Sequence, residues 1–298
     1  MGLDDKWLRA FIQSGAVKEM ALVFADLLLI DGTDITSISR LSKPELIAPL
    51  LKLAGMVSLT GEGVVSRDAG GGRQAHWAMR GDLLFVASCR AELDRVLALH
   101  AAKGEGSLGR SAEFRYMLTQ LPLKGETRLL AYFSDSFIRR LVGPEIKLGQ
   151  LRRIMARADM ESLTARALLA RLDGFKNASS VDALVKARYA PERLLKNSEY
   201  ALDADLVATS RTYGTAARMK TLLEVPLTHV TPPEAQAYGT YMENYTRFWR
   251  QFFDPIAVRL DDAADGHLEL TTFILPLVDN TIYNTLKEIV VTRENGSA

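Results

Sequence analysis

The most strongly patterned part of the chain predicts a helix with an aromatic stripe, followed by two strands. Thr231 and Glu234 have the spacing of a capping box, and Pro255 helps to stop the helix. At about 100° per residue, the large apolar residues between them fall within an arc of roughly 140°. We expect this stripe to be buried against the hairpin of residues 256–260 and 268–275. Its residues are Tyr238, Tyr241, Met242, Tyr245, Phe248, Trp249, Phe252 and Phe253.

The earlier part of the chain alternates between strand and helix patterns. Apolar and β-branched runs bounded by turn residues predict an antiparallel sheet. Its strands are expected within residues 20–41, 57–66, 74–88 and 128–134, with turns at Asp31-Gly32 and at Arg80-Gly81-Asp82. Helices are expected over residues 44–54, 90–102 and 112–121.

Residues 145–172 form the longest helical pattern, with a possible break near Asp159. We expect its apolar side to pack along the sheet. That side contains Leu151, Ile154, Met155, Ala158, Ala165, Leu169 and Leu172. A polar, glycine-containing segment follows at residues 173–180 and is typical of a linker. The chain is therefore expected to be an α+β protein whose antiparallel sheets are covered by helices, in two closely packed parts, residues 1–174 and 175–298.

Composition narrows the classes of function. The chain has 298 residues, of which 48% are hydrophobic and 24% charged, the balance of a globular protein. The formal net charge of +1 gives no global reason to expect nucleic acid as a partner. The single cysteine, Cys89, forms no internal disulfide, and a zinc site would need several ligands from this residue and four scattered histidines. No cofactor is expected.

Positive charge is nevertheless concentrated in one region. Residues 139–171 contain eight basic and three acidic residues, a local balance of +5. Arg152, Arg153 and Arg157 at its centre predict a surface for weak contact with an anionic partner. Because the basic residues spread around the helix, the alternative is an ordinary solvated face.

Three short motifs carry candidate chemistry, and each has a simpler structural interpretation. Gly104 to Gly109 match the letters of a dinucleotide-binding loop, but a helix rather than a strand precedes them. Cys89 lies where a strand enters a helix, a place that favours a nucleophile, yet no spacing links it to His76 or His100, so we expect a buried, inert thiol. Arg80-Gly81-Asp82 has the letters of an integrin-binding site and fits a hairpin turn better.

Acidic residues suggest metal binding at two places. Asp261 to Gly266 resemble the first half of a calcium loop, but Ala263 and Thr272 stand where two ligands are required, so a solvated hairpin loop is expected. Asp203 and Asp205 have a spacing that some metal-dependent transferases use. The same pair on an exposed turn is far commoner, so an exposed turn is expected.

Two sets of segments resemble proteins of bacterial origin. The pattern at residues 81–88, 92–93, 107–108, 114, 121–122 and 129–133 resembles uncharacterised bacterial extracytoplasmic proteins. Residues 252–259 and 272–277 are similar to large bacterial proteins of unknown function. The resemblance implies a recurring α+β fold, often in envelope proteins, and implies no activity and no functional residues. Met1 to Lys6 lack the features of a secretory signal, so we expect a periplasmic or envelope location if the chain comes from a longer precursor, and a cytoplasmic one otherwise.

The sequence contains no specific catalytic signature. We therefore expect a non-catalytic interaction or scaffold module of a bacterial envelope-associated system, whose partner is another protein. The alternative is a hydrolase or transferase whose site is assembled from loops distant in sequence. An enzyme should bring titratable groups together in a pocket, whereas a scaffold should present a broad apolar or basic surface.

Overall fold

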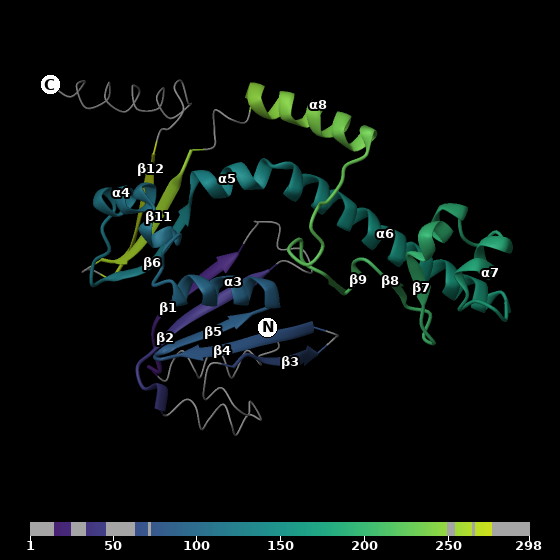
Figure 1. Ribbon diagram of the computed structural model, residues 1–298, viewed down its shortest axis with the longest axis horizontal. Helices are drawn as coiled ribbons and strands as arrows, with labels where there is room; N and C mark the ends of the chain where they lie inside the picture. Colours follow the sequence, from purple (N-terminus) through teal and green to yellow (C-terminus); the bar gives the residue numbers. More distant parts are fainter. Residues whose placement is uncertain are drawn as a thin grey trace. The chain divides into compact units, whose positions relative to one another are not determined.

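A computed structural model of the chain describes residues 15–24, 34–45, 63–70, 73–248, 254–263 and 266–275 (Figure 1). Helices and antiparallel sheets together confirm the α+β class. The chain divides into two compact units, each made of two segments. Unit 1 comprises residues 1–97 and 148–227, and unit 2 comprises residues 98–147 and 228–298. The expected division at residue 174 does not coincide with these units, because side chains on both sides of that residue share one core in unit 1.

The main sheet of unit 1 has five antiparallel strands in the order β1-β2-β5-β4-β3. Alternation along β5 sends Leu84 and Val86 to one face and Phe85 and Ala87 to the other. Helix α3 (Arg90–Ala101) covers the second face (Figure 1). The strands are β1 (Val17–Phe24), β2 (Ile35–Leu41), β3 (Val65–Gly70), β4 (Arg73–Arg80) and β5 (Leu83–Ala87), which confirms the predicted antiparallel sheet.

The turn between β4 and β5 explains the Arg80-Gly81-Asp82 triplet. Gly81 adopts a φ of +59°, a left-handed conformation that glycine reaches without steric cost. The Asp82 carboxylate accepts a hydrogen bond of 2.9 Å from Arg40 on the neighbouring β2. The triplet is therefore a hairpin turn, as expected. The Asp31-Gly32 turn lies outside the described residues, as does most of the helix expected over residues 44–54.

The second core of unit 1 forms around α6 (Pro144–Leu172), a continuous helix without a break at Asp159. One face of α6 packs on smaller elements that follow it in the chain (Figure 1). These elements are α7 (Val181–Lys186), η2 (Glu192–Ser198) and a four-stranded sheet of β7 (Tyr200–Leu202), β8 (Ala208–Ser210), β9 (Gly214–Thr215) and β10 (Arg218–Met219).

Unit 2 is built on a three-stranded antiparallel sheet in the order β12-β11-β6. Met117 and Leu121, in and directly after α4, cover Ala257 on the central strand. The remaining short helices are η1 and α5, and α8 follows a long connection. The bounds are η1 (Leu108–Arg110), α4 (Ala112–Gln120), β6 (Thr127–Phe133), α5 (Asp135–Val142), α8 (Pro232–Phe248), β11 (Ile256–Asp262) and β12 (Leu268–Ile274).

Helix α8 confirms the predicted capping box but not the predicted packing of its stripe. The backbone N–H and the hydroxyl of Thr231 both donate to Glu234, at 2.9 and 2.8 Å. The Tyr238 hydroxyl donates to the carbonyl of Val142, at the end of α5. The Lys147 ammonium lies 5.5 Å from the Tyr241 ring centroid. The rings thus contact the α5–α6 junction, and α4 supplies the buried cluster against the hairpin. Trp249, Phe252 and Phe253 lie outside the described residues.

Candidate functional site

Helix α6 has two apolar faces, and within the described part of the chain only one of them is covered. The covered face joins the second core of unit 1 through Ala156, Met160, Leu163, Ala167 and Ala170, all buried. Leu172, on the other side, is 84% exposed. The exposed large residues of the helix are Leu151, Ile154, Met155, Leu168, Leu169 and Leu172. The expectation that this side packs along the sheet is therefore wrong, because the core of unit 1 uses the opposite, alanine-rich side.

Four of these exposed residues, Leu151, Met155, Leu169 and Leu172, fall on a heptad spacing that Ala158, Ser162 and Ala165 continue. Successive steps of four and three residues place them where a coiled coil has its a and d positions. The pattern lasts three heptads, which is long enough to indicate a helix-pairing seam. We call these positions the α6 stripe: Leu151, Met155, Ala158, Ser162, Ala165, Leu169 and Leu172. Ile154 and Leu168 widen the stripe on one side.

A row of alternating charges borders the other side of the stripe. Arg152, Asp159, Arg166 and Asp173 recur every seven residues, and we call them the charged row. Contacts within the chain hold these residues in place. Asp159 pairs with Arg193 at 2.5 Å. Arg166 donates to the Tyr189 carbonyl at 2.8 Å, and the Tyr189 hydroxyl donates to Asp173 at 2.9 Å.

The predicted basic surface does not form as a single exposed patch. Arg153 is only 3% exposed, on the covered side of α6. Arg157 donates to Glu161 one turn further on, at 2.9 Å, and Arg152 is half-buried. Because these three arginines point to different sides of the helix, they do not present one face to an anionic partner.

A serine–histidine pair lies on β3 and β4. Ser66 and His76 are direct cross-strand partners, and the serine hydroxyl lies 2.7 Å from Nδ1 of the imidazole. Burial, helped by the charge of Arg90, lowers the pKa of His76 below its ordinary value. A neutral imidazole can act as the general base for an adjacent exposed hydroxyl, as in a nucleophilic dyad. Within the described part of the chain, no carboxylate hydrogen-bonds to the second ring nitrogen to orient it.

Cys89 is buried close to the N-terminus of α3. Its thiol lies 3.3 Å from the Thr221 hydroxyl, and its residue is 1% exposed. Thr221 in turn donates its backbone N–H to Glu224. The buried position agrees with the structural interpretation, and the neighbouring hydroxyl supplies no general base.

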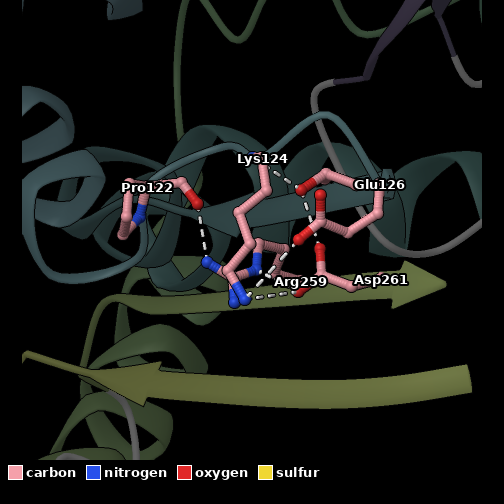
Figure 2. Close-up of polar contacts among 6 residues, drawn as sticks. Pro122, Lys124, Glu126, Arg259 and Asp261 are labelled. Carbon is pink, nitrogen blue, oxygen red and sulfur yellow. Dashed lines mark hydrogen bonds and ion pairs between the residues drawn. The ribbon is translucent and has the colours of Figure 1, made fainter. Parts of the chain in front are cut away.

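A buried ion pair connects the end of β11 to the loop before β6 (Figure 2). Arg259 donates to Asp261 at 2.6 Å and to the Pro122 carbonyl at 2.6 Å. Thr127 donates to the other oxygen of Asp261, Oδ1, at 2.7 Å. The Lys124 ammonium lies 3.9 Å from Oδ2, the oxygen that Arg259 binds. Figure 2 shows both cationic side chains directed toward Asp261.

These contacts correct the expectation of a solvated acidic loop. Asp261 is a buried strand residue, and the turn begins only at Ala263. Burial acts to raise the pKa of Asp261, but the hydrogen bonds from Thr127 and Arg259 outweigh it and hold that pKa below its ordinary value. The hydrogen bonds from Thr127 and Arg259 and the nearby ammonium of Lys124 hold Asp261 in place, so the cluster functions as a structural clamp.

The other acidic and glycine motifs have structural explanations. Asp203 accepts hydrogen bonds from the backbone N–H groups of Asp205 and Val207, which makes an Asx-type turn. Residues 104–109 follow α3 and form consecutive turns that lead into η1. A helix therefore precedes the glycine motif, as expected, and the strand that a dinucleotide-binding loop requires is not in that place.

Among the described residues, no group of three or more His, Cys, Asp or Glu side chains is placed to hold a metal ion. No helix in the same ranges is both long and apolar enough to cross a membrane. Comparison of the chain with protein-family models, with curated proteins and with solved structures gives no match.

Proposed function

We propose that this protein is a non-catalytic interaction module that binds another protein through the α6 stripe. The observation that carries the proposal is the exposure of a three-heptad apolar seam on the side of α6 opposite to its core. Leu169 and Leu172 alone leave two large aliphatic side chains in water. Burial of one such side chain contributes about 1.5 to 3 kcal/mol, so a partner that covers the stripe gains a substantial free energy.

The shape of the surface favours a helical partner. An amphipathic helix recognises a complementary seam through residues at i, i+3, i+4 and i+7, and the stripe has this spacing. The charged row beside it would contribute register and specificity more than affinity, because exposed ion pairs are individually weak. The envelope setting of the proposal rests only on the resemblance in residues 81–88 and 252–259.

The Ser66–His76 pair supports a second candidate, a hydrolase. The hydroxyl–imidazole distance of 2.7 Å and the lowered pKa of His76 are the observations in its favour. Catalysis would also need a group that orients the imidazole and donors that stabilise an oxyanion. We rank this candidate second because the described contacts of the pair include neither.

The proposal is tested by the size of the complex that the protein forms in cells that produce it. We expect wild type to migrate above its monomer mass of 32.9 kDa in native extracts. Leu169→Glu combined with Leu172→Glu should shift it to the monomer. Val207→Glu is the control, since Val207 is exposed but lies outside the stripe. Equal migration of wild type and the double variant would refute the proposal, provided that both give the same circular dichroism spectrum.

A further inference from the structure

We propose that the partner of the α6 stripe is a second copy of this chain, bound with the two α6 helices antiparallel. This inference rests on the proposed function and adds the identity of the partner. Its basis is the order of charges in the charged row, read together with the spacing of the stripe. With the stripe at the a and d positions, the charged row occupies the e positions of the heptad. In an antiparallel helix pair, each e position faces an e position of the other helix. A row of alternating charges can therefore be complementary to a second copy of itself.

One register satisfies every member of the charged row. When Ser162 of one copy opposes Ala165 of the other, Arg152 faces Asp173 of the second copy and Asp159 faces its Arg166. The twofold axis repeats both pairs, which gives four opposite-charge pairs in total. No like charges meet along this row.

The alternative arrangements are disfavoured by the same charges. A shift of one heptad in one direction brings Arg152 against Arg166 and Asp159 against its own copy. A shift in the other direction brings Asp159 against Asp173 and Arg166 against itself. In a parallel pair, g positions face e positions, which puts Lys147 against Arg152 and leaves only Glu161 with an oppositely charged neighbour, Arg166.

The stripe also fits itself in volume in this register. Leu169 opposes Ala158, so that a large side chain meets a small one, and the axis repeats the contact. Met155 and Leu172 meet at each end of the seam. The central pair of Ser162 and Ala165 is small, which lets the two helix backbones approach closely there. These layers bury the most exposed apolar residues of α6.

The contacts that already hold Asp159, Arg166 and Asp173 are compatible with a second copy. Asp159 accepts one hydrogen bond on each carboxylate oxygen, from Arg193 and from Tyr200. A carboxylate has about four acceptor sites, so Arg166 of the second copy finds free lone pairs. Arg166 and Asp173 are exposed, and Arg166 uses Nε and Nη1 on local partners, which leaves Nη2 for the second copy.

Cysteine cross-linking of the full chain tests the register. Ala158→Cys combined with Leu169→Cys should form a covalent dimer under mild oxidation with diamide. Neither single variant should, because two copies of residue 158 would be offset by eleven residues, or about 16 Å along the axis, beyond the reach of a disulfide. Native Cys89 is buried, so wild type treated with diamide measures the background of dimers formed through that cysteine. A covalent dimer from Ala158→Cys with Ser162→Cys, and not from the first pair, would overturn the proposed register.

A charge swap tests whether the partner is a second copy at all. Arg152 and Asp173 are separated by about 31 Å along one helix, so they can compensate each other only between chains. Arg152→Asp and Asp173→Arg should each weaken the dimer measured by sedimentation equilibrium by about tenfold, and the double variant should restore it to within about threefold. A wild type that stays monomeric in this measurement overturns the inference. If wild type forms a larger complex in cell extracts and the stripe variants do not, the proposed function stands with a different partner. If wild type and the stripe variants migrate alike there, both the second-copy inference and the proposed function are refuted.

Discussion

Met160 and Leu169 point to opposite sides of α6. They are nine residues, or two and a half helical turns, apart, and Met160 is fully buried whereas Leu169 is 53% exposed. The helix therefore offers an apolar surface in both directions, and the core of unit 1 uses one of them. This division between a structural face and an open face is the basis of the function proposed for the protein.

The two faces should respond differently to the same substitution. Leu163→Ala removes a fully buried side chain and should lower the free energy of unfolding by about 2 to 5 kcal/mol. Leu169→Ala on the open face should change it by less than about 0.5 kcal/mol in the isolated monomer. Urea unfolding followed by circular dichroism, at a protein concentration where the chain is monomeric, measures both. Similar losses in the two variants would mean that the stripe is covered within the chain.

The sequence predicted the elements of this fold better than the sides on which they pack. Capping residues, turns and strand alternation are local signals, and the predicted β4–β5 hairpin, the capped α8 and the long α6 all appear. The buried side of α6 could not be predicted from the sequence. Its heptad seam of large residues is the stronger apolar pattern, whereas the covered side consists mainly of alanines. Which side meets the core depends on α7 and η2, whose positions are set by tertiary contacts.

The candidate site could be predicted from the sequence only in part, for the same reason. The sequence identifies the residues of the stripe other than Ser162, but as a core face. It counts Arg152, Asp159 and Arg166 only as part of the local +5 and does not single out Asp173, because the use of the charged row depends on a partner. The acidic run of residues 261–266 predicts a loop at Asp261, whereas hydrogen bonds from Arg259 and Thr127 hold it as a buried strand residue. No local pattern signals the contact with Thr127, which lies 134 residues from Asp261 in the chain.

The Arg259–Asp261 clamp should make stability depend on acid. Because the pKa of Asp261 is held below its ordinary value of 3.8, its contribution is fully present above that value and is lost as the pH falls through the lower, folded value. Asp261→Asn should therefore destabilise the protein at pH 7 and differ progressively less from wild type below about pH 4. Thermal unfolding across this range measures the difference. A gap between the two proteins that is the same at pH 3 and pH 7 would contradict the assignment.

His76 should act in a different pH window. Burial lowers its pKa from the ordinary 6.5, so the unfolded chain takes up the proton first as the pH falls. Stability associated with neutral His76 is complete above about pH 6.5 and declines between that value and the folded pKa. His76→Gln should flatten the stability profile in this window while keeping a hydrogen-bonding group opposite Ser66. A profile as steep as that of wild type would place the titration elsewhere.

Cys89 should remain unreactive in the folded protein. Its side chain is buried, and its hydroxyl neighbour Thr221 does not activate a thiol. Iodoacetamide near neutral pH should label the native chain far more slowly than the chain in urea, with mass spectrometry as the readout. Labelling at comparable rates would show that the thiol is accessible and would revive a nucleophilic role for it.

The most direct test of the open face is photo-cross-linking from Leu169 in living cells. A benzophenone amino acid at position 169 should give specific protein adducts upon irradiation, whereas the same group at Val207, exposed but outside the stripe, should give few or none. Adducts of twice the monomer mass would identify a second copy, and adducts of another mass a different protein. If position 169 gives no more adducts than position 207, the α6 stripe is not a binding surface and the proposed function is wrong.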